Sequence, residues 1–499
     1  MTDLTQSTEC SRLSIAHTNS QHCKLKTGHS SMLNPDTLYI VFLYLVPTPY
    51  TVPPLDLFAS SLVCKAWHTE ARPFLDEFVD PTTFNHLFYH KHHNQWYSYT
   101  YHEIIRIAGL LAESRRNGLD HLNLIKRMTI PIDHDDANDS DFNRTVFSFC
   151  YILEQQPPNL TLLRFNLNTT IPRPNRLHRL PRLIFNLQSA CGNISHLHLH
   201  GGSGDPARRA PFHSLIVALS KRLESLVLSR FTLDSNTHAA LSSCTALIDV
   251  RLRTLRNDHL GDVVPAWSNL RSFHYRHHDR RETIDPVLIS LARSCRRLAE
   301  VSISVKNVNI MPAFTYDGLF TLVRWSHALS TLRLVNVGSF SNNFLYYCLL
   351  RHGRRLEYID LEGCPCFLGG APVIVCDGMW PRIKSLSLRA CPNIYESFIR
   401  DVVAACDTLE EIVLPDHLDR GAARYLEPCR FRREAPNVWK RWARPRNEDG
   451  VEEAKMEKAN VIEVQPEKRV RKGKLRATLS RLGRGFKMIL NIRRTPHFS

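Results

Sequence analysis

Histidines alternate at positions 196, 198 and 200, and three imidazoles on one face of a strand could bind a metal ion. No carboxylate that would complete such a site is evident, so a solvent-exposed polar face explains them better. Other polar residues, most of them basic, occupy equivalent alternating positions along the chain. We expect one surface to carry Arg164, His196, His198, His200, Arg251, Arg253, His274, Arg276, Arg333, Tyr358, Asp360, Glu362 and Arg389.

The positive charge of this row predicts a surface that binds an acidic or phosphorylated protein segment. Three members, Tyr358, Asp360 and Glu362, interrupt the positive charge and would repel that ligand. A mixed polar face without a single ligand explains the row equally well, because scattered charges are the default on protein surfaces. The candidate substrate-binding residues are Arg164, His196, His198, Arg251, Arg253, His274, Arg276, Arg333, Tyr358 and Arg389.

The motifs that could indicate a catalytic or metal site are mostly incomplete in this sequence. His102-Glu103 begins like a zinc-protease helix but lacks the second histidine four residues after the first. Cys364-Pro365-Cys366 is too tight for an ordinary zinc pair. Cys364 and Cys391 are better interpreted as small buried turn residues. We therefore predict no catalytic residue, no metal and no cofactor, and a chain that is not an enzyme.

The elements that would position these residues follow from a repeated apolar pattern. The phrase apolar-x-x-apolar-x-apolar recurs ten times, at intervals of 23 to 34 residues. Its last two apolar positions mark a strand with one buried face, and such units must stack to bury it. The phrases begin at Leu160, Ile194, Leu223, Leu247, Leu270, Leu298, Leu329, Leu356, Ile383 and Leu409, and an earlier copy begins at Ile125.

This pattern resembles a leucine-rich repeat array of the irregular, cysteine-containing kind. The resemblance implies an α/β solenoid, a horseshoe with helical returns such as 344–352 and 399–405. An ordinary α/β domain with parallel strands is the alternative. Before the array, Ile104, Ile105, Ala108 and Leu111 indicate an amphipathic helix, and residues 133–141 are predicted to form an acidic loop.

The composition favours a soluble chain in a reducing compartment. Of the 499 residues, 43% are hydrophobic, and no apolar run approaches the ~20 residues that cross a bilayer. Residues 1–31 are polar and carry no apolar signal core. We expect a cytoplasmic and/or nuclear location, where the fourteen cysteines would be reduced thiols.

A second resemblance begins at Leu33. The segment predicts a helix containing Pro35 and Leu38, a proline-rich linker, and a second helix ending near Trp67. The segment resembles an F-box, a small helical module that docks on a Skp-type adaptor of cullin-RING ubiquitin ligases. That resemblance implies that the adaptor is contacted by Leu33, Pro35, Leu38, Val63 and Trp67. A plain helical hairpin that caps the solenoid is the alternative.

The F-box resemblance implies a substrate-recognition subunit that docks on the adaptor and presents a target protein for ubiquitylation. A non-enzymatic scaffold, or a nucleic-acid-associated protein without a ubiquitin-ligase role, is the alternative. The predicted organisation is a disordered N-terminus (1–31), an F-box-like module (32–75), a helical connector (76–124), the solenoid (125–430), a C-terminal cap (431–446) and a disordered charged tail (447–499).

The tail contains much of the net charge of +16, because eleven Lys or Arg and no acid occur after residue 467. Residues 468–474 resemble a nuclear import signal, which implies an import receptor as partner. Apolar residues then recur with helical spacing over 475–489, which suits an anionic membrane or a partner's apolar groove. A solvated tail without a specific role is the alternative.

Overall fold

The chain divides into two units, residues 1–442 and 443–499, and the computed structural model describes residues of the first only. The segments 1–31 and 443–499 and most of the F-box-like segment lie outside the described residues. No helix within the described part has the length and apolar character needed to cross a membrane. The described residues are 60–62, 67, 69, 71, 88–90, 95–97, 100–119, 121–131, 139–166, 183–185, 187, 192–201, 206–253, 259–277, 283–305, 315–338, 340–367 and 380–442.

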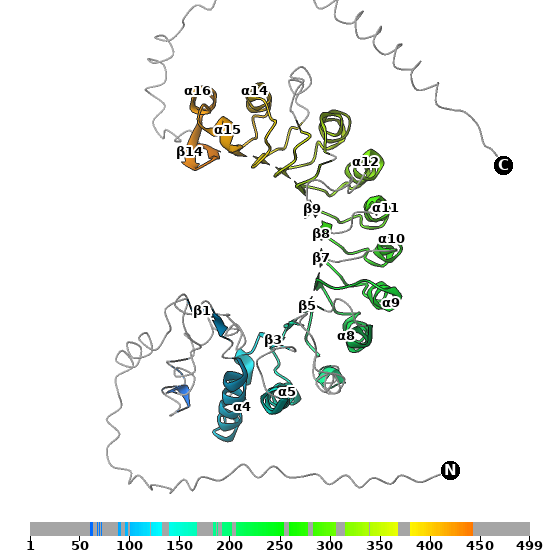
Figure 1. The fold of residues 1–499 in the computed structure, drawn as a ribbon, viewed down its shortest axis with the longest axis vertical. Helices are drawn as coiled ribbons and strands as arrows, with labels where there is room; N and C mark the ends of the chain where they lie inside the picture. The colour runs from blue at the N-terminus through cyan, green and yellow to red at the C-terminus, as the bar shows by residue number, and fades with distance from the viewer. Residues whose placement is uncertain are drawn as a thin grey trace, which may run out of the picture. The chain divides into compact units, whose positions relative to one another are not determined.

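A 13-stranded sheet forms the inner wall of an arc, and strands β3 to β13 are parallel neighbours in chain order (Figure 1). This arrangement confirms the predicted leucine-rich repeat solenoid. The parallel strands are β3 (Arg127–Pro131), β4 (Leu162–Asn166), β5 (His196–His200), β6 (Ser225–Ser229), β7 (Asp249–Arg253), β8 (Ser272–His277), β9 (Glu300–Val305), β10 (Thr331–Val335), β11 (Tyr358–Asp360), β12 (Ser385–Ser387) and β13 (Glu411–Val413).

In the described part of the chain, helical segments return the chain along the outside of the arc between successive strands (Figure 1). They shorten to single turns in places, for example at α10, because a repeat needs only a short apolar cover there. The helices are α5 (Asp139–Glu154), α8 (Pro206–Leu219), α9 (Ser235–Ser242), α10 (Leu260–Val263), α11 (Asp285–Ser294), α12 (Tyr316–Trp325), α13 (Asn342–Phe344), the π-helix η3 (Leu345–Leu350) and α14 (Glu396–Ala405).

The apolar residues of each repeated phrase form one continuous core. In the phrase that contains β5, for example, Ile194, Leu197 and Leu199 are fully buried, whereas His196, His198 and His200 are half-buried on the opposite face. In the phrase that begins at Ile125, the anchors Ile125, Met128 and Ile130 are buried as well, and so is Thr129 between them. Its strand β3 pairs in parallel with β4 at the end of the sheet, so that copy is the first repeat of the array. Burial of a leucine side chain contributes about 2 kcal/mol, and the stacked anchors therefore dominate the stability of the solenoid.

Polar side chains satisfy the backbone where several strands begin, an edge of the sheet that we call the N-terminal edge. Asn193 donates to Pro158 O at 2.6 Å, and Asn269 donates to Thr245 O at 3.3 Å, each reaching the turn of the preceding repeat. At the opposite ends of β11 and β12, the fully buried thiols of Cys364 and Cys391 contact carbonyls of the preceding repeat. Burial raises the pKa of Cys391 to about 11, as expected for a packing residue.

A charged cluster holds the outer helices of two repeats together. Arg209 of α8 is 4% exposed and donates to Asp234 at 2.9 and 3.1 Å. Asp234 is also the N-cap of α9 and accepts from the backbone N and side-chain hydroxyl of Thr237. Burial by itself would raise the pKa of Asp234, but hydrogen bonds from Thr237 and Arg209 hold it at about 2.

The last parallel strand is covered by an antiparallel hairpin of β14 (Phe431–Ala435) and β15 (Val438–Arg441), in which β15 pairs with β13. The indole of Trp439 in β15 is buried and donates to Asp419 at 2.8 Å. Arg433 also pairs with Asp419, which is 5% exposed. The outer strand β14 exposes charged side chains, a feature that opposes edge-to-edge association.

Helix α4 precedes the first strand of the array, and α5 lies between its first two strands. In α4 (Thr100–Arg116), Ile104, Ala108 and Leu111 are buried as predicted, but Ile107 is buried where Ile105 is half-buried. The predicted acidic loop over 133–141 is wrong at its end, because α5 begins at Asp139. Carboxylates in a first helical turn complement the helix dipole, so acidic residues there favour helix as well as loop.

Candidate recognition surface

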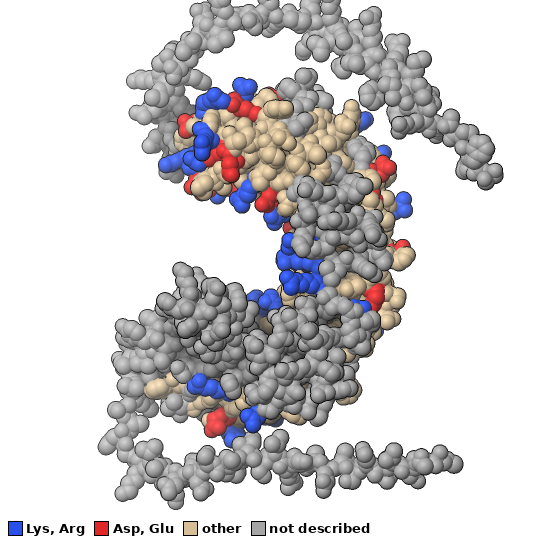
Figure 2. Space-filling model, in the orientation of Figure 1, with Lys and Arg blue, Asp and Glu red and all other residues tan. Residues whose placement is uncertain are grey.

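The parallel register aligns the outward residues of successive strands into rows across the inner wall. Arg251 pairs with His274, His274 with Ser302, and Ser302 with Arg333, which in turn pairs with Asp360. Lys and Arg side chains gather on this wall in Figure 2. The structure thus brings the central predicted residues into one row across β7 to β11.

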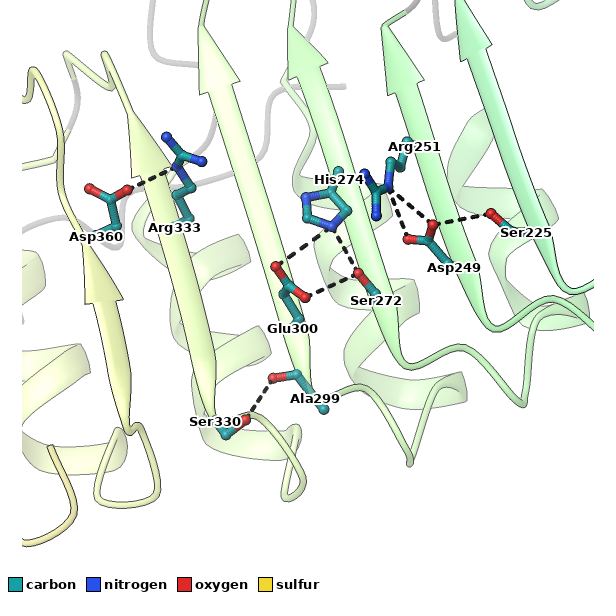
Figure 3. Close-up of polar contacts among 10 residues, drawn as sticks. All are labelled: Ser225, Asp249, Arg251, Ser272, His274, Ala299, Glu300, Ser330, Arg333 and Asp360. Carbon is teal, nitrogen blue, oxygen red and sulfur yellow. Dashed lines mark hydrogen bonds and ion pairs between the residues drawn. The ribbon is translucent and has the colours of Figure 1, made fainter. Parts of the chain in front are cut away.

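Carboxylates neutralise two of the arginines in this row (Figure 3). Arg251 Nε lies 3.0 Å from Asp249 Oδ2, on the same strand. Arg333 lies 2.9 Å from Asp360 and 3.2 Å from Glu362, both contributed by the next repeat. Asp360 and Glu362 therefore act mainly as partners of Arg333, and they do not form a separate acidic surface.

Three imidazoles of the inner wall, those of His198, His200 and His274, have lowered pKa values, so they add little positive charge at pH 7. Burial, followed by the charge of Arg164, lowers the pKa of His198 to about 4. Burial, followed by Arg230 and Arg253, lowers the pKa of His200. Burial also lowers the pKa of His274, more than Glu300 at 3.6 Å raises it.

A hollow of about 420 Å³ lies over the C-terminal halves of β7 to β10. Within the described residues, Arg253 and Arg276 form no ion pair in this hollow, and both are exposed. They follow the last registered pair of β7 and β8, Leu252 with Tyr275, so they lie on adjacent strands. Two guanidinium groups that line one hollow repel each other, and an anion between them would relieve that repulsion.

The candidate residues were chosen mainly for their charge, so they did not include the uncharged residues that line the hollow. Ser302, Ser304 and Asn336 contribute two hydroxyls and an amide beside the arginines. The serines occupy the outward positions of β9, so the same alternation that selected the arginines also identifies them. Asn336 is different, because its backbone turns at φ 57°, a conformation that asparagine tolerates better than most residues.

The remaining predicted residues lie on the same wall but outside the hollow. Arg164 of β4 is exposed, and its guanidinium lies 3.4 Å from Nδ1 of His198. His196 contacts the hydroxyl of Ser195 at 2.8 Å. Tyr358 is 45% exposed at the start of β11, and Arg389 is exposed just after β12. No group of three potential metal ligands occurs in the described part of the chain, and the alternating histidines of β5 are no exception.

The F-box-like segment contributes few described residues. Of the five predicted adaptor contacts, Leu33, Pro35, Leu38 and Val63 lie outside the described residues, and Trp67 is helical and half-buried. Ser61 is fully buried and lies 2.8 Å from Nε2 of His121, which precedes β3. The other ring nitrogen of His121 lies 2.6 Å from the hydroxyl of Ser114 in α4.

The direction of these hydrogen bonds follows from the serine protons. Ser114 donates its hydroxyl proton to Leu119 O at 3.0 Å, so Nδ1 of His121 must donate to Ser114. In a neutral imidazole, Nε2 then accepts from Ser61. The buried relay connects residue 61 with α4 and with the segment that leads into the first strand.

Comparisons with known proteins add little to this geometry. No family model matches the sequence, and no curated protein matches it. One solved structure with a similar arrangement is the complex of Rad7 and Elc1 from yeast, at 14% identity over 76% of this chain and 91% of that chain. The TM-score is 0.35, a likeness too low to bear on function.

Proposed function

We propose that this protein is a non-catalytic subunit of a cullin-RING ubiquitin ligase that recognises target proteins. The F-box-like segment 32–75 docks on a Skp-type adaptor, and the inner wall of the solenoid holds an acidic or phosphorylated segment of the target. Such a subunit accelerates ubiquitylation by proximity, because it holds the target near the transfer machinery. The chain would act in the cytoplasm or the nucleus.

The observation that carries the target-binding half is the hollow that contains Arg253 and Arg276. The neighbouring arginines, Arg251 and Arg333, are already paired with carboxylates. The two arginines without a carboxylate partner among the described residues are therefore the ones available to an incoming anion. The serine hydroxyls beside them can donate to the same anion, as an acidic or phosphorylated side chain requires.

The target-binding half is tested with Arg253→Glu combined with Arg276→Glu. Binding of the full-length protein to an array of acidic and phosphorylated peptides should fall at least about tenfold, because two charge-assisted contacts become repulsive. Arg420→Glu with Arg432→Glu, two exposed arginines outside the candidate residues, changes the net charge equally, serves as the control and should weaken the same peptides less than threefold. Equal losses in both proteins would show that general charge, and not the hollow, attracts the peptides.

The adaptor-binding half rests on the sequence pattern and is tested separately. Pro35→Ala with Trp67→Ala should abolish co-purification with a Skp-type adaptor. The Arg253→Glu, Arg276→Glu protein should keep it, because the two sites lie on different segments. Adaptor recovery at the wild-type level from the Pro35, Trp67 variant would exclude the F-box assignment and leave peptide binding to stand by itself.

A further inference from the structure

The N-terminal edge of the sheet is lined by exposed arginines. Parallel strands all begin at one edge, so the turns that lead into β6 through β12 lie side by side there. Two acidic residues, Glu224 and Glu357, occur in these turns, and Glu357 is paired with Lys384 at 2.8 Å. The exposed basic residues of these turns are Lys221, Arg222, Arg271, Arg296, Arg297, Arg354, Arg355 and Arg382.

The repeat fold accounts for only some of these cations. Arg222 and Arg355 donate to Gly192 O and His327 O, as asparagines do in other repeats. Two further arginines near this edge, Arg293 and Arg324, occupy the last turns of α11 and α12, where a cation complements the helix dipole. A further set fits neither role and forms no ion pair or side-chain hydrogen bond within the described residues. These are Lys221, Arg271, Arg296, Arg297, Arg354 and Arg382.

A cavity of about 660 Å³ opens on this edge between the ends of α11 and α12. Arg293, Arg296, Thr321 and His327 contribute polar groups to its lining, and Trp325 contributes an indole that is 55% exposed. The guanidinium carbon of Arg324 lies 5.3 Å from the centre of that ring. A large aromatic ring is thus exposed to solvent within a cavity that two arginines line, which the packing of the repeats does not require.

We propose that the N-terminal edge binds single-stranded nucleic acid. One base stacks against Trp325 in the cavity, and the flanking phosphates contact Arg296 and Arg297 and then Arg354 on the turn after next. Aromatic stacking beside a basic groove is the usual way in which proteins hold single strands. A volume of this size accommodates a small ligand such as one nucleotide.

The choice of cation supports nucleic acid over a lipid surface. Arginine predominates over lysine along this edge, and its planar guanidinium both binds phosphate bidentately and stacks on bases. A membrane-binding edge would present a cluster of apolar side chains. Here a single indole lies among Thr321, His327 and arginines, groups that can hydrogen-bond to the edge of a base.

The test measures binding of the full-length protein to fluorescein-labelled oligodeoxythymidine and oligouridine by anisotropy. Arg296→Glu with Arg297→Glu should weaken binding at least about tenfold and lower its salt dependence. The matched control is Arg420→Glu with Arg432→Glu, two exposed arginines at the C-terminal end of the array, which changes net charge equally. The control should weaken binding less than threefold. Equal effects of both reversals would show binding through net charge or the basic tail, and would overturn the proposal.

Trp325 provides a test at constant charge. Trp325→Ala should weaken oligonucleotide binding about fivefold or more, and Trp325→Phe should retain part of the affinity. Wild-type affinity in Trp325→Ala would overturn the stacking site.

A second experiment measures binding of the same proteins to vesicles of phosphatidylcholine with phosphatidylserine. If the Arg296, Arg297 reversal abolishes vesicle binding but leaves oligonucleotide binding intact, the edge is a membrane surface and the proposal is wrong. Thermal unfolding curves verify that each variant is folded.

Discussion

Arginines at different positions of the repeated phrase differ in what they can bind, because their neighbours differ. Arg251 and Arg333 occupy equivalent positions on β7 and β10, and both are held by carboxylates. Arg253 and Arg276, further along β7 and β8, have no such partner within the described residues. A guanidinium already paired with a carboxylate gains little from a second anion, so the unpaired arginines determine where an acidic ligand binds.

His198 should make the solenoid sensitive to mild acid. Its pKa is about 4 in the folded protein, against an ordinary value of 6.5. The unfolded chain therefore takes up a proton that the folded protein refuses, and stability falls as the pH drops from about 6.5 towards 4. His198→Gln should flatten this loss, measured as the shift in urea midpoint between pH 7.5 and pH 5. Replacement of His259, which lies on an exposed turn, is the control. An unchanged shift in His198→Gln would contradict the argument.

At the level of elements, the outer helices depend on contacts between repeats more than on their own sequences. Helix α9 has only 8 residues, fewer than an isolated helix needs in water. Its cap, Asp234, also balances the buried charge of Arg209 from α8. One carboxylate therefore satisfies a helix terminus and a buried cation together. Its loss should destabilise both α8 and α9.

Asp234→Ala should destabilise the protein by about 3 kcal/mol, because it removes the cap and leaves Arg209 buried without its partner. Asp234→Asn keeps a capping oxygen and should cost less. Urea unfolding at pH 7 measures both, and the exposed Asp262→Ala in the first turn of α10 should stay within about 0.5 kcal/mol of wild type. The contribution of Asp234 is present above about pH 3.8 and is lost as the pH falls towards 2. Equal costs for Asp234→Ala and Asp262→Ala would refute the cluster.

At the level of the whole solenoid, stability is approximately a sum over neighbouring repeats, and the ends need protection. The hairpin β14–β15 supplies it at the C-terminal end, where it pairs with the edge of β13. Trp439 joins this hairpin to the buried carboxylate of Asp419. Loss of the hairpin should therefore destabilise the adjoining repeats and leave the distant repeats unaffected.

Trp439→Ala should cost about 4 kcal/mol, because it removes a buried indole and the donor to Asp419. Hydrogen exchange should show faster exchange in β12 to β15 and unchanged protection in β4 to β6. Trp442→Ala, at a side chain that is 58% exposed, is the control and should leave both regions unchanged. Faster exchange along the entire array in Trp439→Ala would mean that the solenoid unfolds as one unit.

The amino-acid sequence by itself determined the period of the repeats, the strands and the side of each strand that faces outward. These features depend on the local alternation of apolar and polar residues, such as that of Leu197 and Leu199 with His198. Tertiary structure alone decided which charges are free. Arg333 meets Asp360 and Glu362 because adjacent repeats stack in register, and His198 is neutral because stacking buries it. The arginines of the N-terminal edge likewise lie in separate turns along the chain. Only the parallel register brings them together, because it places every strand start on the same side.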